Sequence, residues 1–392
     1  MHPIRHRQRF PHLAVGLVAF ALALSGCAED SAGSEAKSTS TEDAAAVRAD
    51  AKRVVDAAAK GTSVLPDADP RPAAVGKSVV LVPNGMNNAS SAVTVVGMQE
   101  ACEAIGWTCT IIDAESNPAK YAGSIRQAIA QKPDAIVTHG IDCSAVALPL
   151  KEARKAGIVT VNSTSYDCEE PLYDGTPLYN DPVDPVDGEA VTYAEFLPYF
   201  GAARGAAIVL GVGDEVPSVI DLQANEVALL TDIRDGTMGF VERIPGAQLH
   251  SSEMKFADLG PKLESLVTSE LLKNPEANAF SAPFGAAYVT GAGAALERAN
   301  KDDMFVMGVE GIPAELDLVR AGVVDAAIYS PTKWTGWASI DVANSLFTDA
   351  PIVKSGQGWL YVTKENLPAG AGEEPLDKFP DYQAAYEAAW AR

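Results

Sequence analysis

Short apolar runs alternate with amphipathic stretches over most of the chain. Four runs rich in Val, Ile and Thr predict buried strands, at residues 78–82, 108–113, 135–139 and 158–161. Helical composition fills the intervals between them, at residues 90–105, 120–131 and 144–155. Because alternating strands and helices build a parallel sheet covered on both faces, this part of the chain predicts an open α/β lobe.

A second α/β unit follows the first. It is predicted to start with a strand at residues 206–211 (AAIVLG) and a long helix at residues 219–243. Strands and helices then alternate, at residues 248–252, 260–273, 279–282, 285–300, 305–308, 313–321 and 326–329. A chain of 392 residues is long enough for two such units. The predicted fold class is therefore α/β, with two Rossmann-like lobes of parallel sheet.

The N-terminus has the pattern of an export signal. Three arginines precede the apolar run at residues 13–24, and small residues lead to Cys27. The run is too short to span a bilayer, which needs about 20 residues. The tetrapeptide LSGC at residues 24–27 resembles the lipobox of bacterial lipoproteins. This resemblance implies that residues 1–26 are a signal peptide and that lipidation of Cys27 anchors the chain to the extracytoplasmic face of the cell membrane.

Composition excludes several other classes of protein. The 52 acidic and 30 basic residues give a formal charge of −22, which repels phosphate backbones and anionic lipids. We therefore expect no nucleic-acid partner, and membrane contact through the lipid anchor only. With 47% hydrophobic and 21% charged residues, the chain is not disordered overall.

Segments of different composition flank the two lobes. After the lipid site, residues 28–43 are small and polar and predict a flexible tether. A helix is predicted at residues 44–60, and the proline-rich residues 66–76 predict a second linker. Residues 364–392 predict a C-terminal extension packed on the body, helical from Tyr382 onward.

The four cysteines after Cys27 predict two disulfides. An even number in an exported chain allows three pairings. Cys102 lies near the end of a predicted helix and Cys109 on the next strand, while Cys143 and Cys168 each follow a strand of one βαβ unit. We therefore predict the pairs Cys102–Cys109 and Cys143–Cys168. A metal site that uses His139, Cys143 and Cys168 would lack a CxxC pair and a second nearby histidine, so the disulfides are favoured and no metal is expected.

A ligand site is expected beyond the carboxyl ends of the strands, where open parallel sheets bind their ligands. The loops expected there are rich in Asn, Ser, Thr and Asp, which suits a neutral guest that bears hydroxyl groups. They are residues 83–91, 113–117, 140–143, 162–167, 212–218, 283–285, 309–311 and 330–334.

Enzyme motifs do not account for these loops. The sequence contains no P-loop, no GxGxxG after the first strand and no GxSxG turn. The acids Asp142, Asp167, Glu215 and Glu310 are near the expected cleft, but so acidic a chain brings carboxylates together by chance. We therefore expect neither catalysis nor a cofactor.

The run from residue 77 to residue 363 resembles the type I periplasmic binding proteins that serve sugar ABC importers, the ribose-binding group in particular. The order and spacing of several motifs carry the resemblance: GKSVVLVPNGMNN (76–88), GMQEA (97–101), IGW (105–107), NPAK (117–120), IRQAIAQKPDAI (125–136), KAGI (155–158), GVEGIP (308–313) and residues 328–336. The resemblance implies a monomer that closes on a ligand and presents it to an ABC permease.

The resemblance also implies how the lobes are divided. The first lobe is expected to comprise residues 77–181 and 331–352, and the second residues 182–330 and 353–363. A three-strand hinge is expected to join them, with bending near residues 180–181, 310–311 and 330–331.

Carried over position by position, the resemblance gives a set of candidate ligand-binding residues: Asn88, Ser90, Ser91, Thr164, Ser165, Phe284, Glu310, Ser330 and Trp334. Asn88 matches the family's binding Asn, whereas Ser90 and Ser91 stand in place of a pair of Phe and Glu310 in place of an Asp. Trp334 is expected either in the cleft or in the core. Because most of the family's charged and amide contacts are missing, ribose itself is not expected.

These residues fit more than one kind of ligand and more than one kind of partner. A bulkier glycoside or polyol, a partly aromatic compound, or a cation held by Glu310 would each suit these residues. The main expectation is a solute-binding lipoprotein for transport of a sugar-like molecule. The alternatives are a ligand-sensing lipoprotein that signals to a membrane partner and, less favoured, an enzyme.

Overall fold

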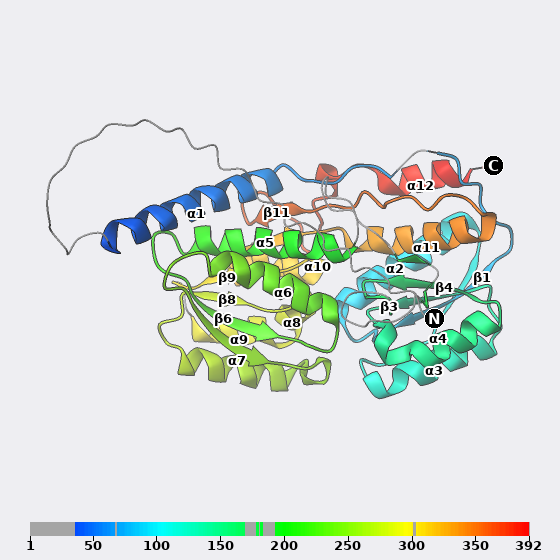
Figure 1. The fold of residues 1–392 in the computed structure, drawn as a ribbon, viewed down its shortest axis with the longest axis horizontal. Helices are drawn as coiled ribbons and strands as arrows, with labels where there is room; N and C mark the ends of the chain where they lie inside the picture. The colour runs from blue at the N-terminus through cyan, green and yellow to red at the C-terminus, as the bar shows by residue number, and fades with distance from the viewer. Residues whose placement is uncertain are drawn as a thin grey trace, which may run out of the picture.

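Two α/β lobes lie side by side in the computed structural model of the protein (Figure 1). The structure describes residues 36–66, 69–168, 178–179, 181–182, 193–300 and 303–391. The predicted signal peptide (1–26), Cys27 and the start of the predicted tether lie outside these residues. Among the helices described, none combines the length and the apolar character that crossing a bilayer requires.

The first lobe holds a five-stranded parallel sheet in the order β2-β1-β3-β4-β5. Its elements are β1 (Ser78–Pro83), α2 (Ala89–Ile105), β2 (Thr108–Ile111), α3 (Pro118–Ala130), β3 (Ala135–His139), α4 (Cys143–Lys155), β4 (Val159–Ser163) and β5 (Asp181–Pro182). The four strands and three helices predicted here are confirmed, with bounds shifted by a residue or two. Every residue of β3 is buried, as expected for a central strand covered on both faces.

The second lobe holds a six-stranded sheet in the order β11-β10-β9-β8-β6-β7, parallel except for β11. Its elements are α5 (Tyr193–Gly211), β6 (Ser218–Gln223), α6 (Ala228–Val241), β7 (Gln248–Glu253), α7 (Pro261–Lys273), β8 (Ala279–Ser281), α8 (Gly285–Ala287), η2 (Tyr288–Ala292), α9 (Gly293–Ala299), β9 (Phe305–Met307), α10 (Pro313–Ala321), β10 (Ala326–Tyr329) and β11 (Leu360–Thr363). The predicted α/β fold class is therefore confirmed for both lobes.

The prediction was wrong at the start of the second lobe. The run AAIVLG is the last part of α5, not a strand, and the strand β6 lies inside the long helix predicted at residues 219–243. The physical reason is burial. Ala206–Val209 is fully buried within a helix, and a short apolar run of this kind cannot be told from a buried strand by periodicity.

The chain crosses between the lobes on one side of the molecule. α11 (Thr332–Thr348) follows β10 but packs against α2 in the first lobe, and the chain then returns to β11 in the second. The two helices are in close contact because a Cβ on Gly336 would lie 2.5 Å from the Met98 nitrogen. The bend expected at residues 310–311 was wrong, since this segment joins β9 to α10 within the second lobe. The bend expected at residues 180–181 falls partly outside the described residues, because Asn180 is not among them.

The apolar core consists of two clusters, one of which extends through both lobes. One cluster of buried apolar side chains runs continuously from the first sheet through α5 and α11 into the second sheet. A separate cluster, which includes Ile125, Ile136 and Leu150, fills the space between the first sheet and the helices α3 and α4. The lobes thus share apolar packing on the side where the chain crosses.

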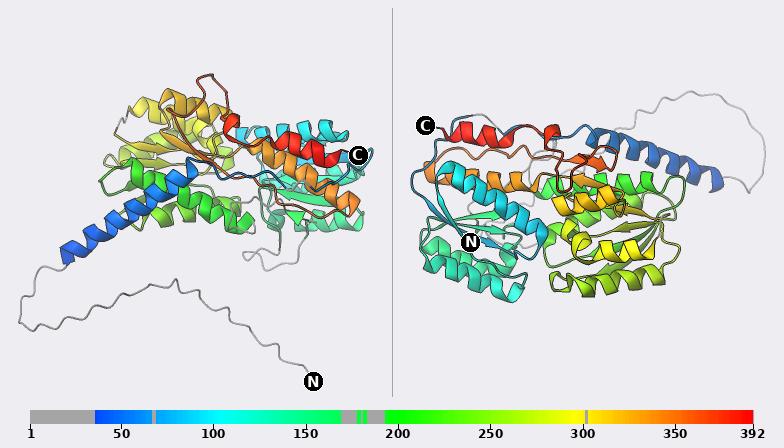
Figure 2. Two further views of the ribbon diagram at one scale, coloured as in Figure 1. Left: turned by 90° about the horizontal axis from the view of Figure 1, so that it is seen from above. Right: turned by 180° about the vertical axis from the view of Figure 1, so that it is seen from behind.

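Segments outside the two sheets cover that side of the molecule (Figure 1). α1 (Ala36–Ala58) begins earlier than the helix predicted at residues 44–60 and packs on α5. It is fixed by Arg48, which donates to the carbonyls of Gly213 (2.8 Å) and Glu215 (2.7 Å), and by an Asp50–Arg243 ion pair. Figure 2 shows α1 extending beyond the second lobe at one end of the molecule.

The C-terminal helix α12 (Tyr382–Trp390) lies on the first lobe instead. Its Trp390 stacks on Trp337 of α11 with a centroid distance of 5.6 Å, and the linker before β1 runs alongside, with Arg71 N–H donating to the Ala389 carbonyl. The N-terminal segment therefore contacts both lobes.

Candidate ligand-binding site

A cavity of about 150 Å³ lies between the lobes, beyond the carboxyl ends of the strands. The first lobe contributes the segments that follow β1, β3 and β4. The second lobe contributes α5, α6 and the segments that follow β7, β8 and β9, and the crossing segments contribute Ser330 and Gln357. A ligand in this cavity touches both lobes.

Polar side chains form the first-lobe wall. Asn88 caps α2, because its side-chain oxygen accepts the N–H of Ser90 at 3.0 Å. The Ser91 hydroxyl donates to the side-chain oxygen of Asn84 at 2.7 Å. These side chains face the cavity and also fix the start of α2.

Two further residues of this wall have unusual environments. Burial lowers the pKa of His139 to about 4, so its imidazole is neutral at pH 7. Thr164 has a φ of 54°, in the left-handed region that costs a residue with a branched Cβ. Strained backbone of this kind is concentrated at functional sites, and here it places Thr164 on the cavity wall.

Aromatic and aliphatic side chains form the second-lobe wall. Phe196 and Phe200 project from one face of α5 and pack edge-on against Trp359, with centroid distances of 5.1 and 5.8 Å. Phe256 and Phe284 form a second aromatic pair at 5.3 Å. The cavity thus has one polar wall and one apolar wall.

Glu310 lies where the two walls meet. Its carboxylate accepts the hydroxyl of Ser90 from the first lobe and the N–H of Gly285 (2.9 Å) from the second. It is the only Asp or Glu among the described residues that line the cavity, and no Lys or Arg of this part of the chain lines it. The site therefore offers an anionic acceptor but no cation to neutralise an anionic ligand.

Two buried ionisable side chains, Glu315 and Arg204, hold the Glu310 loop in place. The carboxyl of Glu315 accepts the N–H groups of Val309 (2.7 Å) and Gly311 (2.8 Å), on either side of Glu310. Arg204 on α5 donates to the carbonyls of Gly308 (3.1 Å) and Ala282 (2.9 Å). Glu315 and Arg204 position the loops that follow β8 and β9.

Burial, together with the neighbouring Glu310 carboxylate, raises the pKa of Glu315 to about 8. The folded protein therefore holds a proton on Glu315 that the unfolded chain releases near pH 4.5. Between about pH 4.5 and pH 8, this group makes the free energy of unfolding fall as the pH rises, and above pH 8 its contribution is flat.

We predict that Glu315→Gln removes this part of the pH dependence. Urea unfolding at pH 5, 6, 7 and 8 should show the variant gaining stability relative to the wild type as the pH rises. The exposed Glu297 on α9 gives the matched control, Glu297→Gln, for which the difference should not change with pH. A constant difference for Glu315→Gln would contradict the prediction.

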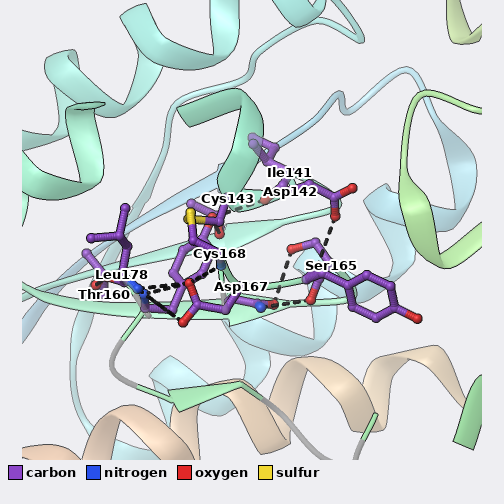
Figure 3. The surroundings of a disulfide bond; sticks show 12 residues. Ile141, Asp142, Cys143, Thr160, Ser165, Asp167, Cys168 and Leu178 are labelled. Atoms are coloured by element: carbon purple, nitrogen blue, oxygen red, sulfur yellow. Dashed lines mark hydrogen bonds between the residues drawn. A yellow bond between two sulfur atoms is a disulfide. The ribbon is translucent and has the colours of Figure 1, made fainter. Parts of the chain in front are cut away.

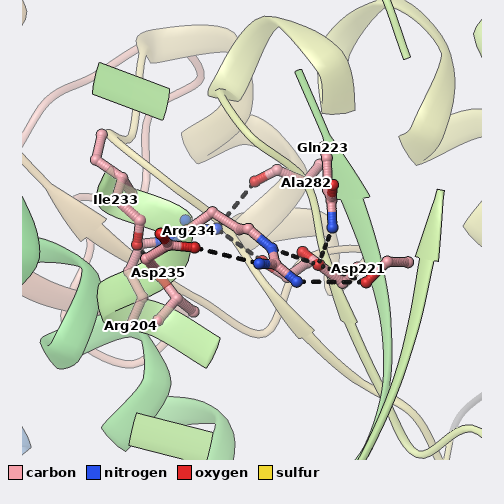
Figure 4. A network of polar contacts seen from close by, with 10 residues as sticks. Arg204, Asp221, Gln223, Ile233, Arg234, Asp235 and Ala282 are labelled. Atoms are coloured by element: carbon pink, nitrogen blue, oxygen red, sulfur yellow. Dashed lines mark hydrogen bonds and ion pairs between the residues drawn. The ribbon is translucent and has the colours of Figure 1, made fainter. Parts of the chain in front are cut away.

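An ion pair between Arg234 and Asp221 holds α6 against the sheet. Figure 4 shows Arg234 reaching from α6 to the carboxylate of Asp221 on β6, at 2.8 Å. Asp221 is buried and also accepts the hydroxyl of Ser251 at 3.1 Å. The contact fixes the helix whose Leu230 and Ile233 line the cavity.

Hydrogen bonds from the first lobe close the cleft onto α6. Asp142 accepts the N–H of Ala228, the first residue of α6, at 2.8 Å, and the Tyr166 hydroxyl donates to Asp232 one turn later. A carboxylate at a helix N-terminus satisfies an unpaired N–H and interacts favourably with the helix dipole. These contacts join the lobes beside the cavity.

The predicted disulfides are both present, as Cys102–Cys109 and Cys143–Cys168. The second lies next to the interlobe contacts (Figure 3), because Cys143 follows Asp142 and its N–H donates to the carbonyl of Tyr166 at 3.0 Å. It therefore ties together the two loops that bind α6.

The structure places most of the predicted ligand-binding residues in one cavity wall or another: Asn88, Ser90, Ser91, Thr164, Phe284, Glu310 and Ser330. Two lie elsewhere. Ser165 is buried behind the wall, where its hydroxyl bonds Asn162 at 3.2 Å. Trp334 lies in the core rather than the cleft, because it stacks on Tyr382 of the C-terminal helix at 4.6 Å.

The apolar wall was missed apart from Phe284. Phe196 and Phe200 escaped notice because α5 was not predicted, although their spacing of four residues fits one face of a helix. Phe256 follows β7, at a strand end that was left out of the expected cleft loops. The segment 212–218 was included wrongly, since it precedes β6 and lies at the opposite end of the sheet.

A family model described as "Periplasmic binding protein domain" matches residues 79–350. A curated relative, the ribose import binding protein RbsB of Escherichia coli (strain K12), is 21% identical over 270 residues, which is 69% of this chain and 84% of the relative. The chain belongs to the periplasmic binding protein family.

Solved structures with the same fold include ABC transporter solute-binding proteins from two other bacteria. One, from Agrobacterium vitis, is bound with α-D-tagatopyranose; it is 19% identical, has a TM-score of 0.63, and the match covers 74% of this chain and 95% of that one. Another, from Mycobacterium smegmatis with bound glycerol, is 20% identical, has a TM-score of 0.63, and the match covers 76% of this chain and 98% of that one. At these identities the similarity establishes the two-lobed fold.

Proposed function

We propose that this protein is an extracytoplasmic solute-binding lipoprotein. It captures a small, sugar-like molecule between its lobes by hinge closure and delivers it to an ABC permease. The observation that carries the proposal is the cavity with one wall from each lobe, in a chain of a family whose members bind solutes. The sugar and polyol bound by the similar proteins support a small neutral guest.

The proposed mechanism is conformational. A guest that touches both lobes binds the closed form better than the open form, and it shifts the population by that difference in affinity. The three contacts between the lobes, made by Ser90, Asp142 and Tyr166, favour the same closed form. Closure buries the guest and assembles the surface that the permease recognises.

Small-angle scattering tests this mechanism. Native mass spectrometry of the freshly purified protein identifies the guest, which is then removed by mild unfolding and refolding. Adding it back should reduce the radius of gyration, because the lobes close around it. An unchanged radius at saturation would contradict the hinge mechanism.

The lipid anchor is a separate part of the proposal, because Cys27 lies outside the described residues. The lipobox motif supports it, and two acyl chains hold a protein on a bilayer without a spanning helix. We predict that Cys27→Ala leaves an unprocessed precursor or releases the protein from the membrane fraction. Unchanged fractionation and unchanged mass of the mature chain would exclude the anchor.

A further inference from the structure

The side chains that line the cavity indicate a ligand that is less polar than a sugar. Six apolar side chains dominate the wall from the second lobe: Phe196, Phe200, Leu230, Ile233, Phe256 and Phe284. They come from α5, from α6 and from two separate loops, so the apolar surface curves around the guest. Burying the apolar part of a ligand against this surface is favourable, whereas a ligand hydroxyl group finds no hydrogen-bond partner there.

Most polar groups at the cavity are already paired within the protein. The Asn88 oxygen accepts from Ser90 N–H, and the Ser90 hydroxyl donates to Glu310. On the crossing segments, Thr335 donates to Gln357 (2.8 Å), and Gln357 donates to Ser330 (2.9 Å). A hexose would leave several hydroxyls unpaired, and each of these lowers affinity by roughly tenfold.

The remaining groups suit a guest with one hydrogen-bonding end. The Glu310 carboxylate has acceptor positions beyond those that Ser90 and Gly285 use, so it can accept one more hydrogen bond from a guest hydroxyl. In the described part of the chain no protein group pairs with the side-chain amide hydrogens of Asn88 or with the Thr164 hydroxyl, which both line the cavity. These groups belong to the polar wall from the first lobe, whereas the aromatic pair Phe256 and Phe284 belongs to the wall from the second lobe.

The size of the site agrees with a single ring. A cavity of about 150 Å³ accommodates one six-membered ring such as benzene. The absence of Lys and Arg from the described lining, together with the Glu310 carboxylate, disfavours carboxylates and phosphates.

We propose that the ligand is an uncharged, single-ring alcohol or phenol of low polarity. Its ring lies against the wall formed by Phe256, Phe284 and Leu230, and its hydroxyl donates to Glu310. This inference rests on the solute-binding part of the proposed function, because it describes the guest of the same cleft, and it replaces the sugar-like guest by a less polar one.

Isothermal titration of the purified, guest-free protein with chosen probes tests the inference. The probes are benzyl alcohol, 4-methylphenol and cyclohexanol, compared with D-ribose, D-glucose and glycerol, and with benzoate and benzylamine as charged counterparts. We expect a ring alcohol or phenol to bind at least about tenfold more tightly than any of the sugars, glycerol, benzoate or benzylamine.

A pair of substitutions links the binding to the apolar wall. Leu230→Asn places an amide in the wall and should weaken binding of the ring alcohol about tenfold or more. Leu272→Asn makes the same change at a residue on α7 that is 77% exposed, and it should leave the affinity unchanged. Thermal unfolding of both variants shows whether each is folded.

The outcomes separate this inference from the proposed function. Tighter binding of a sugar, glycerol or benzylamine, with compaction on binding, overturns the ligand class and keeps the solute-binding function. Binding of none of the probes overturns the ligand class. Equal affinity of the Leu230→Asn and wild-type proteins for the ring alcohol overturns its placement on this wall.

Discussion

Arg71→Met is expected to lower the free energy of unfolding by about 3–5 kcal/mol, because it leaves a buried carboxylate without its cation. Arg71 is 1% exposed, and its Nε lies 3.2 Å from both carboxylate oxygens of Asp341 on α11. Asp341 also accepts the indole N–H of Trp390 at 2.7 Å. Urea unfolding followed by circular dichroism measures the loss.

The pH dependence and two controls distinguish this cause from a general packing defect. Burial already raises the pKa of Asp341 despite Arg71, and removing Arg71 raises it further. Protonation relieves the buried charge, so the loss should be smaller at pH 5 than at pH 7. Arg126→Met at the exposed ion pair with Glu152 should leave the free energy of unfolding nearly unchanged, because solvent screens an exposed pair. The double variant Arg71→Met with Asp341→Asn should recover part of the loss; no recovery would contradict the charge argument.

Replacing Cys143 and Cys168 by Ser should lower the free energy of unfolding by about 3.5 kcal/mol in the chain-entropy model. The two cysteines are 25 residues apart, so the disulfide removes much freedom from the unfolded chain. The loops it joins also carry Asp142 and Tyr166, which bind α6 across the cleft. The variant should therefore also be more open, with a larger radius of gyration in solution than the wild type.

The other disulfide provides the matched control. Cys102 and Cys109 are 7 residues apart at the far end of α2, and replacing both should cost about 2.5 kcal/mol. Because the interlobe hydrogen bonds described above, from Ser90, Asp142 and Tyr166, do not come from that loop, the radius of gyration should not change. Equal radii for the two double variants would show that the Cys143–Cys168 disulfide does not support closure.

The sequence was sufficient for the elements whose periodicity is unambiguous. The strands β1 and β3 are short Val- and Ile-rich runs between helices of clear composition. Both disulfides followed from the predicted helices and strands on which, or just after which, the cysteines lie. The prediction failed at α5, because an apolar run of six residues shows neither the helical nor the strand period. Its burial comes from packing against α1 and α6, which are distant contacts that no local pattern records.

The candidate site likewise contains residues that could be placed from the sequence and residues that could not. Asn88, Ser90 and Glu310 lie in the loops or at the helix start that follow strand carboxyl ends, so the topology takes them to the cleft. Trp334 could not be placed from sequence, because the C-terminal helix that covers it lies about fifty residues further along the chain, beyond the residues 79–350 that the family model matches. The positioning role of Glu315 was detectable only as an acid in the first turn of a helix just after Glu310.

The attachment of α1 bears on how the proposed lipid anchor would hold the molecule. Arg48 and Asp50 fasten this helix to the second lobe, so an anchor at Cys27 would hold that lobe near the bilayer. With the proposed hinge, the first lobe, together with α12, would then be the part that moves during capture and release. A transporter in the same bilayer would meet one stationary docking face and one face that arrives only with cargo.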